Sequence, residues 1–138
     1  MKNTFILILS ILLLASCDEA GGNDRTVATE YMKAIARETN EKGKLPAKVN
    51  EYTIAEKVTF DVNSNVLTYN YKLYTDIYSK SEWQRMLRDV EVEQIQNARS
   101  LHSNNKFYQL LKVTINSVYL DFDGNEIYSF KIKPEQYL

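Results

Sequence analysis

Residues 58–73 read VTFDVNSNVLTYNYKL, and this stretch decides the fold. Apolar residues occupy alternate positions on both sides of the polar run 63–65. Such alternation is typical of a half-buried β-strand, and a short polar run between two alternating segments is typical of a tight turn. The stretch therefore predicts a β-hairpin. The apolar positions in and around it are Ile54, Val58, Phe60, Val62, Leu67, Tyr69, Tyr71, Leu73 and Ile77.

The segment before this hairpin has helical periodicity. Val27, Tyr31 and Ile35 recur at a spacing that places them on one face of an α-helix. The pattern predicts an amphipathic helix over residues 25–42. We expect it to end near Gly43, because glycine is favoured just past the last helical turn.

A second helix is predicted after the hairpin. Ser79 and Glu82 have the spacing of a capping box, in which two side chains satisfy free backbone N–H groups at a helix start. Apolar residues at helical spacing continue to about His102, and a further turn is expected through 107–110. His102, the only histidine, has no partner at catalytic or metal-ligand spacing. We expect it to face solvent at the helix end, where the helix dipole favours a cation.

The C-terminal part of the chain predicts a second hairpin. Gly124 can supply a positive φ in its turn at 123–125, and the last strand covers 127–132. Before the turn, apolar residues fall on odd positions over 111–115 and on even positions over 118–122. This change of parity near Asn116 and Ser117 predicts a β-bulge or a bend.

The two hairpins echo each other, since residues 58–65 and 118–125 align without a gap and share the same apolar alternation. The order helix, strand, strand is then repeated. It predicts an α+β fold with one four-stranded antiparallel sheet and two helices on one face. A genuine duplication and the common pattern of amphipathic hairpins both account for the match. The identical pairs are Val58 and Val118, Asp61 and Asp121, and Asn65 and Asn125.

The N-terminal segment has the pattern of a signal peptide. Lys2 is followed by an apolar run over 5–15, which is too short to span a bilayer as a stable helix. The next motif, Leu14-Ala15-Ser16-Cys17, resembles the lipobox of bacterial lipoproteins. The resemblance implies cleavage before Cys17 and attachment of a diacylglycerol to its thiol through a thioether, so that acyl chains such as palmitate hold the protein at a membrane. An ordinary secretory signal with a leftover thiol is the alternative.

Cys17 therefore divides the chain. We expect a signal peptide at 1–16, a lipidated flexible tether at 17–24 and a single domain at 25–138. Cys17 is the only cysteine, so its lipidation would leave no thiol for a disulfide, a nucleophile or a metal site. The Asp18-Glu19 pair resembles the signal that keeps lipoproteins of enteric-type bacteria in the inner membrane, facing the periplasm. Other bacteria use this region differently, so the outer membrane is the alternative.

The mature part of the chain resembles small, uncharacterised exported bacterial proteins that share a Leu-Pro pair, a Tyr-x-Tyr strand and a late hairpin with Asp and Gly. The matching residues are Leu45-Pro46, Tyr69, Tyr71, Asp121 and Gly124. The cysteine pair of those proteins is absent here. The repeated order is also similar to β-lactamase-inhibitor-type proteins and small outer-membrane assembly lipoproteins, by analogy of fold alone. These resemblances imply no activity.

Composition and motifs exclude several classes of function. The net charge is −1, so the basic excess of a nucleic-acid-binding domain is missing. The chain has no glycine-rich phosphate loop, no His-Glu-x-x-His and no Gly-x-Ser-x-Gly. The run 121–126 begins like a calcium loop, but its Asp and Gly positions do not fit the EF-hand template, and a hairpin turn explains it better. We expect no nucleic-acid partner, no metal and no cofactor.

The sequence predicts a non-enzymatic, lipid-anchored interaction module that inhibits, protects against or helps to assemble another protein of the cell envelope. A small-ligand binder under the helices is an alternative, and so is an envelope hydrolase that uses carboxylates such as Asp61 or Asp121 as acid and base. Exposed tyrosines amid polar residues are typical of protein interfaces, although aromatic residues also pack on sheets for structural reasons. The candidate binding residues are Tyr69, Tyr71, Tyr74, Tyr119 and Tyr128.

Overall fold

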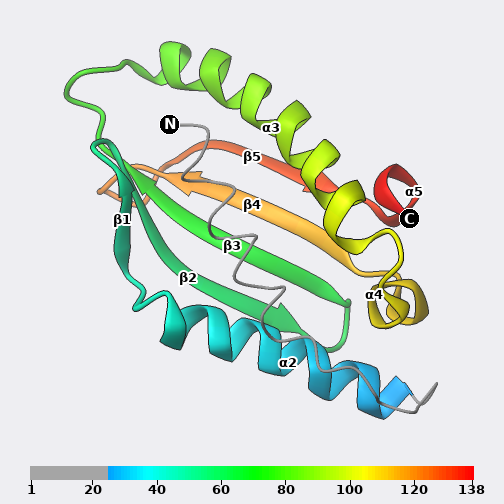
Figure 1. Ribbon diagram of the computed structural model, residues 1–138. Helices are drawn as coiled ribbons and strands as arrows, with labels where there is room; N and C mark the ends of the chain where they lie inside the picture. Colours follow the sequence, from blue (N-terminus) through cyan, green and yellow to red (C-terminus); the bar gives the residue numbers. More distant parts are fainter. Residues whose placement is uncertain (1–24) are drawn as a thin grey trace.

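A single mixed β-sheet forms the centre of the molecule in the computed structural model, which describes residues 25–138 (Figure 1). The strands lie in chain order across the sheet: β1 (Ala47–Asn50), β2 (Thr53–Asp61), β3 (Val66–Leu73), β4 (Thr114–Leu120) and β5 (Glu126–Ile132). The helices of the described residues are α2 (Arg25–Lys42), α3 (Lys80–His102), α4 (Lys106–Leu111) and α5 (Pro134–Tyr137).

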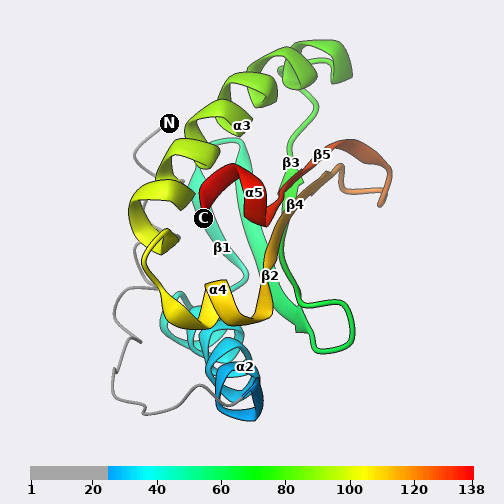
Figure 2. The same cartoon turned by 90° about the vertical axis from the view of Figure 1, so that its right-hand side faces the viewer.

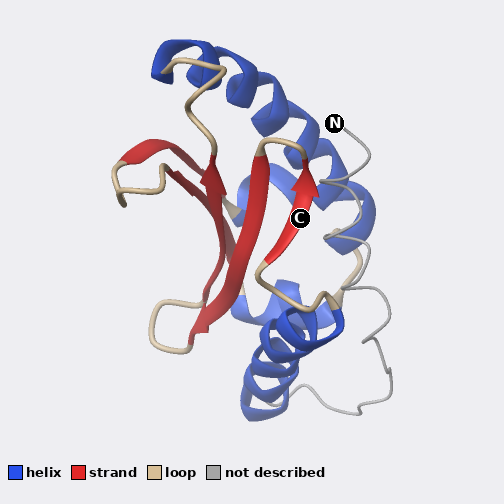
Figure 3. Ribbon diagram, turned by 90° about the vertical axis from the view of Figure 1, so that its left-hand side faces the viewer, coloured by secondary structure: helices blue, strands red, loops and turns tan. Residues whose placement is uncertain are grey.

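The helices cover one side of the sheet only. Helix α2 packs along β2 and helix α3 packs along β5, so that the two long helices flank the central strands. Figures 2 and 3 show all the helices on the same side, with no helix on the opposite side. The predicted α+β architecture with both long helices on one face is therefore confirmed at this level.

The predicted four-stranded, wholly antiparallel sheet is wrong in two respects. The structure adds the short edge strand β1, and β3 pairs with β4 in parallel. The parallel pair follows from the connection: α3 runs back along the sheet after β3, so β4 starts from the same end as β3. A helical crossover of this kind is the usual link between adjacent parallel strands.

The predicted bulge near Asn116 and Ser117 is also wrong. Strand β4 keeps an unbroken register with β3, and its inward residues Ile115, Ser117 and Tyr119 are buried. The parity of the apolar residues changes because Ser117 is a buried polar residue, while Val118 lies on the opposite face of β4. The sequence pattern therefore reflects an apolar residue on the outer face, with no extra residue inserted.

Irregularities in the sheet lie elsewhere. In β2 the register with β3 shifts between Ala55 and Lys57, and in the second hairpin it shifts between Tyr119 and Leu120. A shift in β2 explains why the outward Ile54 and the inward Val58 both fall on even positions. Ile77, expected to extend β3, lies in the loop before α3.

The helix boundaries match the sequence closely. Helix α2 covers Arg25–Lys42, and a side chain at Gly43 would come within 2.7 Å of the Thr39 carbonyl oxygen. The capping box forms as predicted, with Glu82 N donating to Ser79 Oγ at 3.3 Å and Ser79 N donating to Glu82 Oε1 at 2.9 Å. The extra turn is α4, which is capped by the side chain of Asn105.

Both hairpin turns are built on a carboxylate. Asp61 Oδ1 accepts a hydrogen bond from Asn63 N at 2.9 Å, and Asp121 Oδ1 accepts one from Asp123 N at 2.9 Å. This shared turn chemistry explains the echo between 58–65 and 118–125. A duplicated origin of the two halves stays a prediction.

Candidate functional site

The five candidate tyrosines do not share one surface. Tyr69, Tyr71 and Tyr119 point to the helix-covered side of β3 and β4 and are buried. Tyr128 and Tyr74 are half-buried. The binding role of these residues stays a prediction, and their positions divide them into a core group and two residues closer to solvent.

The core group packs as an aromatic layer. The rings of Tyr71 and Tyr119, which are paired across β3 and β4, lie parallel with centroids 4.6 Å apart. Phe130 extends this layer into β5. Burial raises the pKa of both tyrosine hydroxyls well above the ordinary value of 10, so both stay neutral. Packing in the core accounts for the strand positions of these rings.

Tyr128 joins β5 to α3. Its hydroxyl donates a 2.6 Å hydrogen bond to Glu91 Oε1, and this bond to the carboxylate is the main reason that the pKa of Tyr128 is raised. A charge-assisted bond of this length holds the helix against the edge strand.

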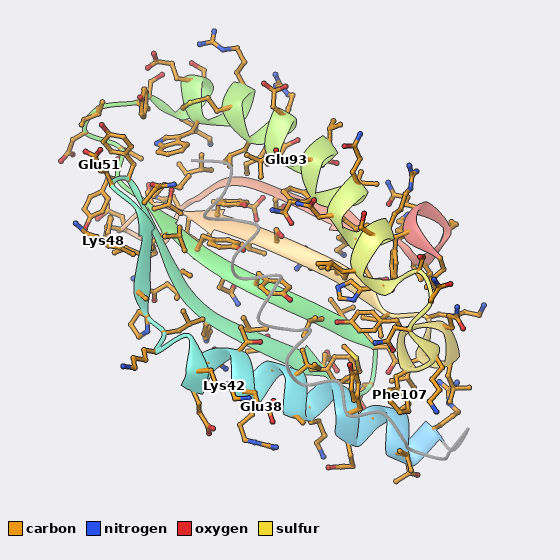
Figure 4. The ribbon with its side chains drawn as sticks, viewed as in Figure 1. Glu38, Lys42, Lys48, Glu51, Glu93 and Phe107 are labelled. Atoms are coloured by element: carbon orange, nitrogen blue, oxygen red, sulfur yellow. The ribbon has the colours of Figure 1, made fainter. Side chains whose placement is uncertain are left out.

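Exposed aromatic and apolar side chains gather at one end of the sheet. Figure 1 shows that the β1–β2 turn, the β3–α3 loop and the β4–β5 turn meet at this end, and Figure 4 labels Glu51 in the first of them. Phe122 is 49% exposed and Ile77 is 60% exposed, although both are large and apolar. We call this region the aromatic end surface. It consists of Tyr52, Tyr74, Ile77, Tyr78 and Phe122.

Direct contacts connect the four aromatic members of the aromatic end surface. The ring of Tyr74 packs against that of Phe122 at 4.7 Å, and the ring of Tyr52 packs edge-on against that of Tyr78 at 5.4 Å. The two pairs are joined where Tyr74 N donates a 2.9 Å hydrogen bond to Tyr52 O. Because each ring has an aromatic neighbour, these side chains are held in place before any partner arrives.

A buried tryptophan contacts two residues of the aromatic end surface from the core side. Trp83, in the first turn of α3, is 1% exposed and packs edge-on against Tyr78 at 5.4 Å. Its indole Nε1 donates a 3.0 Å hydrogen bond to the carbonyl oxygen of Tyr74. The loop 74–79 is therefore tied to the start of the helix, which the capping box fixes in turn.

Phe122 lies at the tip of a rigid turn. The Asp121 side chain accepts hydrogen bonds from the backbone N–H groups of Asp123 and Asn125, so the backbone around Phe122 is well defined. Lys72 Nζ lies 5.7 Å from the Phe122 ring centroid and 3.9 Å from Glu56 Oε1. The sequence reading placed Phe122 among alternating strand residues. The flanking Asp121 and Asp123 were the signal that it belongs to an exposed turn.

The two carboxylates considered for catalysis lie at opposite ends of the sheet. Asp61 ends β2 beside the start of β3, whereas Asp121 follows the end of β4, which runs parallel to β3. The length of β3 separates them by roughly 20 Å at about 3.3 Å per residue. Backbone hydrogen bonds lower the pKa of each carboxyl below its ordinary 3.8, so neither is set up as a proton donor near neutral pH. The pair cannot serve one substrate as acid and base.

A second group of polar atoms lies in the interior near α4. His102 stacks on Tyr108 with ring centroids 4.1 Å apart, and burial, with a smaller contribution from the nearby Tyr108, raises the pKa of the Tyr69 hydroxyl well above 10. Within residues 25–138, the hydroxyls of Tyr69 and Tyr108 and Nε2 of His102 are buried without a hydrogen-bond partner. This is where the polar groups for a small-ligand site under the helices would lie, and that alternative stays a prediction.

The expected solvent-facing position of His102 is wrong. The side chain is 2% exposed and forms part of the interior between α3, α4 and α5. Burial lowers the pKa of its imidazole to about 4, so it is neutral at physiological pH. The reason is that α4 and α5 pack against the C-terminal end of α3, where Tyr108 and Tyr137 lie on the imidazole ring.

The residues that the structure describes contain neither a candidate metal site nor a candidate membrane-spanning helix. In the described range, 25–138, no three His, Cys, Asp or Glu side chains cluster in a way that could hold a metal ion. None of the helices there is both long and apolar enough to cross a bilayer. Cys17, the predicted lipidation site, lies outside the described residues.

Comparison with known proteins shows that the fold is similar to those of two solved structures. No protein-family description matches the sequence, and no curated protein matches it either. Among solved structures, a protein from Pseudomonas aeruginosa described as secreted has a TM-score of 0.62 at 11% identity, over 86% of this chain and 100% of that one. A pilotin of the Vibrio vulnificus type 2 secretion system has a TM-score of 0.52 at 8% identity, over 80% of this chain and 96% of that one. At these identities the likeness concerns the fold alone.

Proposed function

We propose that this protein is a lipid-anchored interaction module of the bacterial cell envelope, which inhibits, protects against or helps to assemble another envelope protein. The observation that carries the proposal is the aromatic end surface, where Phe122 and Ile77 are exposed together with the half-buried Tyr52, Tyr74 and Tyr78. Clustered, exposed apolar side chains mark interaction sites more often than solitary ones do.

The composition of this surface suits binding to a protein. Aromatic side chains contribute much of the energy of protein interfaces, because they bury a large area and have few rotatable bonds. The contacts of Tyr74 with Phe122 and of Trp83 with the Tyr74 carbonyl hold the surface in one arrangement. Little side-chain entropy would be lost on binding, which favours affinity. Tyr74 is the one candidate tyrosine of the sequence analysis that lies in this surface.

The likeness of fold supports an envelope setting. Both similar structures come from exported or secretion-system proteins, and neither description names an enzyme activity. The separation of Asp61 from Asp121 supports a non-enzymatic role as well.

The lipid anchor rests on the lipobox at 14–17. We propose that Cys17 carries the lipid and that Asp18 and Glu19 keep the protein in the inner membrane, with the outer membrane as the alternative. The test is a Cys17→Ser variant expressed in the native cells and followed by fractionation. We expect the wild type in the membrane pellet at its mature length, and the variant either released from the pellet or kept at the full precursor length. A variant that stays in the pellet at the mature length of the wild type would rule the anchor out.

Binding is tested by affinity purification of the tagged, lipidated protein from its native envelope. We expect a stoichiometric envelope protein with the wild type and its loss with the double variant Ile77→Ser and Phe122→Ser. The matched control is Val62→Ser with Val92→Ser, which removes exposed apolar side chains from the other hairpin and from α3. Equal capture by both double variants would place the interaction elsewhere.

A further inference from the structure

We infer that the segment of the partner that docks on the aromatic end surface is basic, with lysine or arginine side chains around an apolar anchor. This inference rests on the proposed function and names the chemistry of the partner at the same site. It is carried by the charges that surround the exposed rings.

Acidic side chains outnumber basic ones around the surface. Within two positions of its five residues along the chain, the carboxylates are those of Glu51, Asp76, Asp121 and Asp123, and the ammonium groups are those of Lys72 and Lys80. Lys72 is already placed beside Glu56, so its charge is largely matched within the domain. We call these charged side chains the rim of the surface. The rim has more carboxylates than ammonium groups and is therefore negatively charged.

Two carboxylates of the rim, those of Asp76 and Asp123, are available to a partner, whereas that of Asp121 accepts hydrogen bonds within its own turn. Asp76 and Asp123 are exposed, and neither carboxylate is held by another side chain of residues 25–138. Asp121 is ionised at neutral pH, because backbone N–H groups lower the pKa of its carboxyl below 3.8. Asp121 and Asp123 directly flank Phe122 along the chain, so both carboxyls belong to the turn that presents the phenyl ring.

A negatively charged rim favours a positively charged partner. A membrane surface rich in anionic lipids would be repelled by this rim, and an acidic segment would meet like charges. A basic segment would gain a faster encounter and the correct orientation from the rim, while Phe122 and Ile77 bury its apolar side chains. The surface thus fits an amphipathic, positively charged stretch of another protein.

The test uses two short synthetic peptides with the same apolar residues, one interspersed with lysine and its twin with glutamate. Each carries a fluorescent label, and binding to the mature lipidated protein in nanodiscs is followed by polarisation at several salt concentrations. We expect tighter binding of the lysine peptide, weakening as salt screens the rim. The double variant Asp76→Asn and Asp123→Asn should weaken that binding by roughly twofold to thirtyfold, because each exposed charge pair accounts for a factor of about 1.4 to 5.

A matched control is the double variant Asp89→Asn and Glu135→Gln, which removes two exposed charges from α3 and α5. It should leave the affinity unchanged. Equal binding of the two twins, or binding of neither, overturns the inference of a basic partner. The proposed function would survive that result if the Ile77→Ser and Phe122→Ser variant still lost its partner in the cell, so the two failures are distinguishable.

Discussion

The indole Nε1 of Trp83 donates a 3.0 Å hydrogen bond to the backbone carbonyl oxygen of Tyr74, and this bond links the hydrophobic core to the aromatic end surface. Trp83, in the first turn of α3, is almost fully buried, whereas Tyr74 packs against the exposed Phe122. The shape of the proposed binding surface therefore depends on a residue that no partner would touch.

The variant Trp83→Phe tests this link. It keeps an aromatic ring but removes the donor, so we expect the free energy of unfolding to fall by about 1–3 kcal/mol, the cost of one buried hydrogen-bonding group with some lost packing. Amide exchange in the loop 74–79 should accelerate more than exchange elsewhere. The control is Phe107→Leu, a core change in α4, at the other end of the sheet. Equal acceleration in both variants would contradict the link.

The capping box of α3 gives a second prediction. Ser79→Ala removes the side chain that accepts from Glu82 N, and we expect a loss of about 1 kcal/mol in urea unfolding. The pKa of Glu82 is lowered below 4.5, chiefly because its carboxylate accepts from the Ser79 backbone N–H. Its contribution to stability is thus complete above pH 4.5 and is lost as the pH falls through the lower, folded-state pKa. Glu82→Gln should reduce this loss of stability at acidic pH. An unchanged loss of stability would disprove the assignment to Glu82.

Tyr108 and Tyr137 form a matched pair of buried tyrosines with ring centroids 6.3 Å apart. The Tyr137 hydroxyl donates a 2.6 Å hydrogen bond to Val113 O, whereas the Tyr108 hydroxyl has no partner within residues 25–138. We expect Tyr137→Phe to destabilise the protein by about 1–3 kcal/mol and Tyr108→Phe to leave it equally or more stable. Thermal unfolding of both variants is the measurement. A clear loss of stability in Tyr108→Phe would mean that its hydroxyl is hydrogen-bonded in solution.

His102 provides a prediction for pH. Because burial depresses its folded-state pKa to about 4, below the 6.5 of an ordinary histidine, the unfolded chain binds the proton first as the pH falls. Stability should therefore be complete above pH 6.5 and decline between pH 6.5 and about 4. The imidazole signal in an NMR titration should still be that of the neutral form at pH 5.5, within that window. Titration near pH 6.5 would show that the imidazole ring is solvated. The variant His102→Phe should lose the part of the decline in stability that His102 causes.

Local rules predicted the local structure. The limits of α2, the capping box at Ser79 and the turns at 63–65 and 123–125 each depend on a few neighbouring residues, and each appears in the structure. The parallel pairing of β3 with β4 depends on the path of α3, which no periodicity within the strands encodes. The extra strand β1 is too short to give an alternating pattern.

The candidate site was only partly predictable, because exposure is decided by tertiary packing. Tyr69, Tyr71 and Tyr119 have the same strand pattern whether their face is covered or open, and in the structure the face is covered. Ile77 and Phe122 look like strand residues by hydrophobicity, but the chain turns at both positions. Their exposure follows from the loops that meet at one end of the sheet.

The most direct test of the central claim is site-specific photo-crosslinking in living cells, with a photoreactive phenylalanine analogue at position 122 of the full-length, lipidated protein. Position 62, at the tip of the other hairpin, is the control because Val62 is similarly exposed. We predict a discrete adduct with one envelope protein from position 122 and none from position 62. No adduct from position 122, or the same adduct from both positions, would contradict the account.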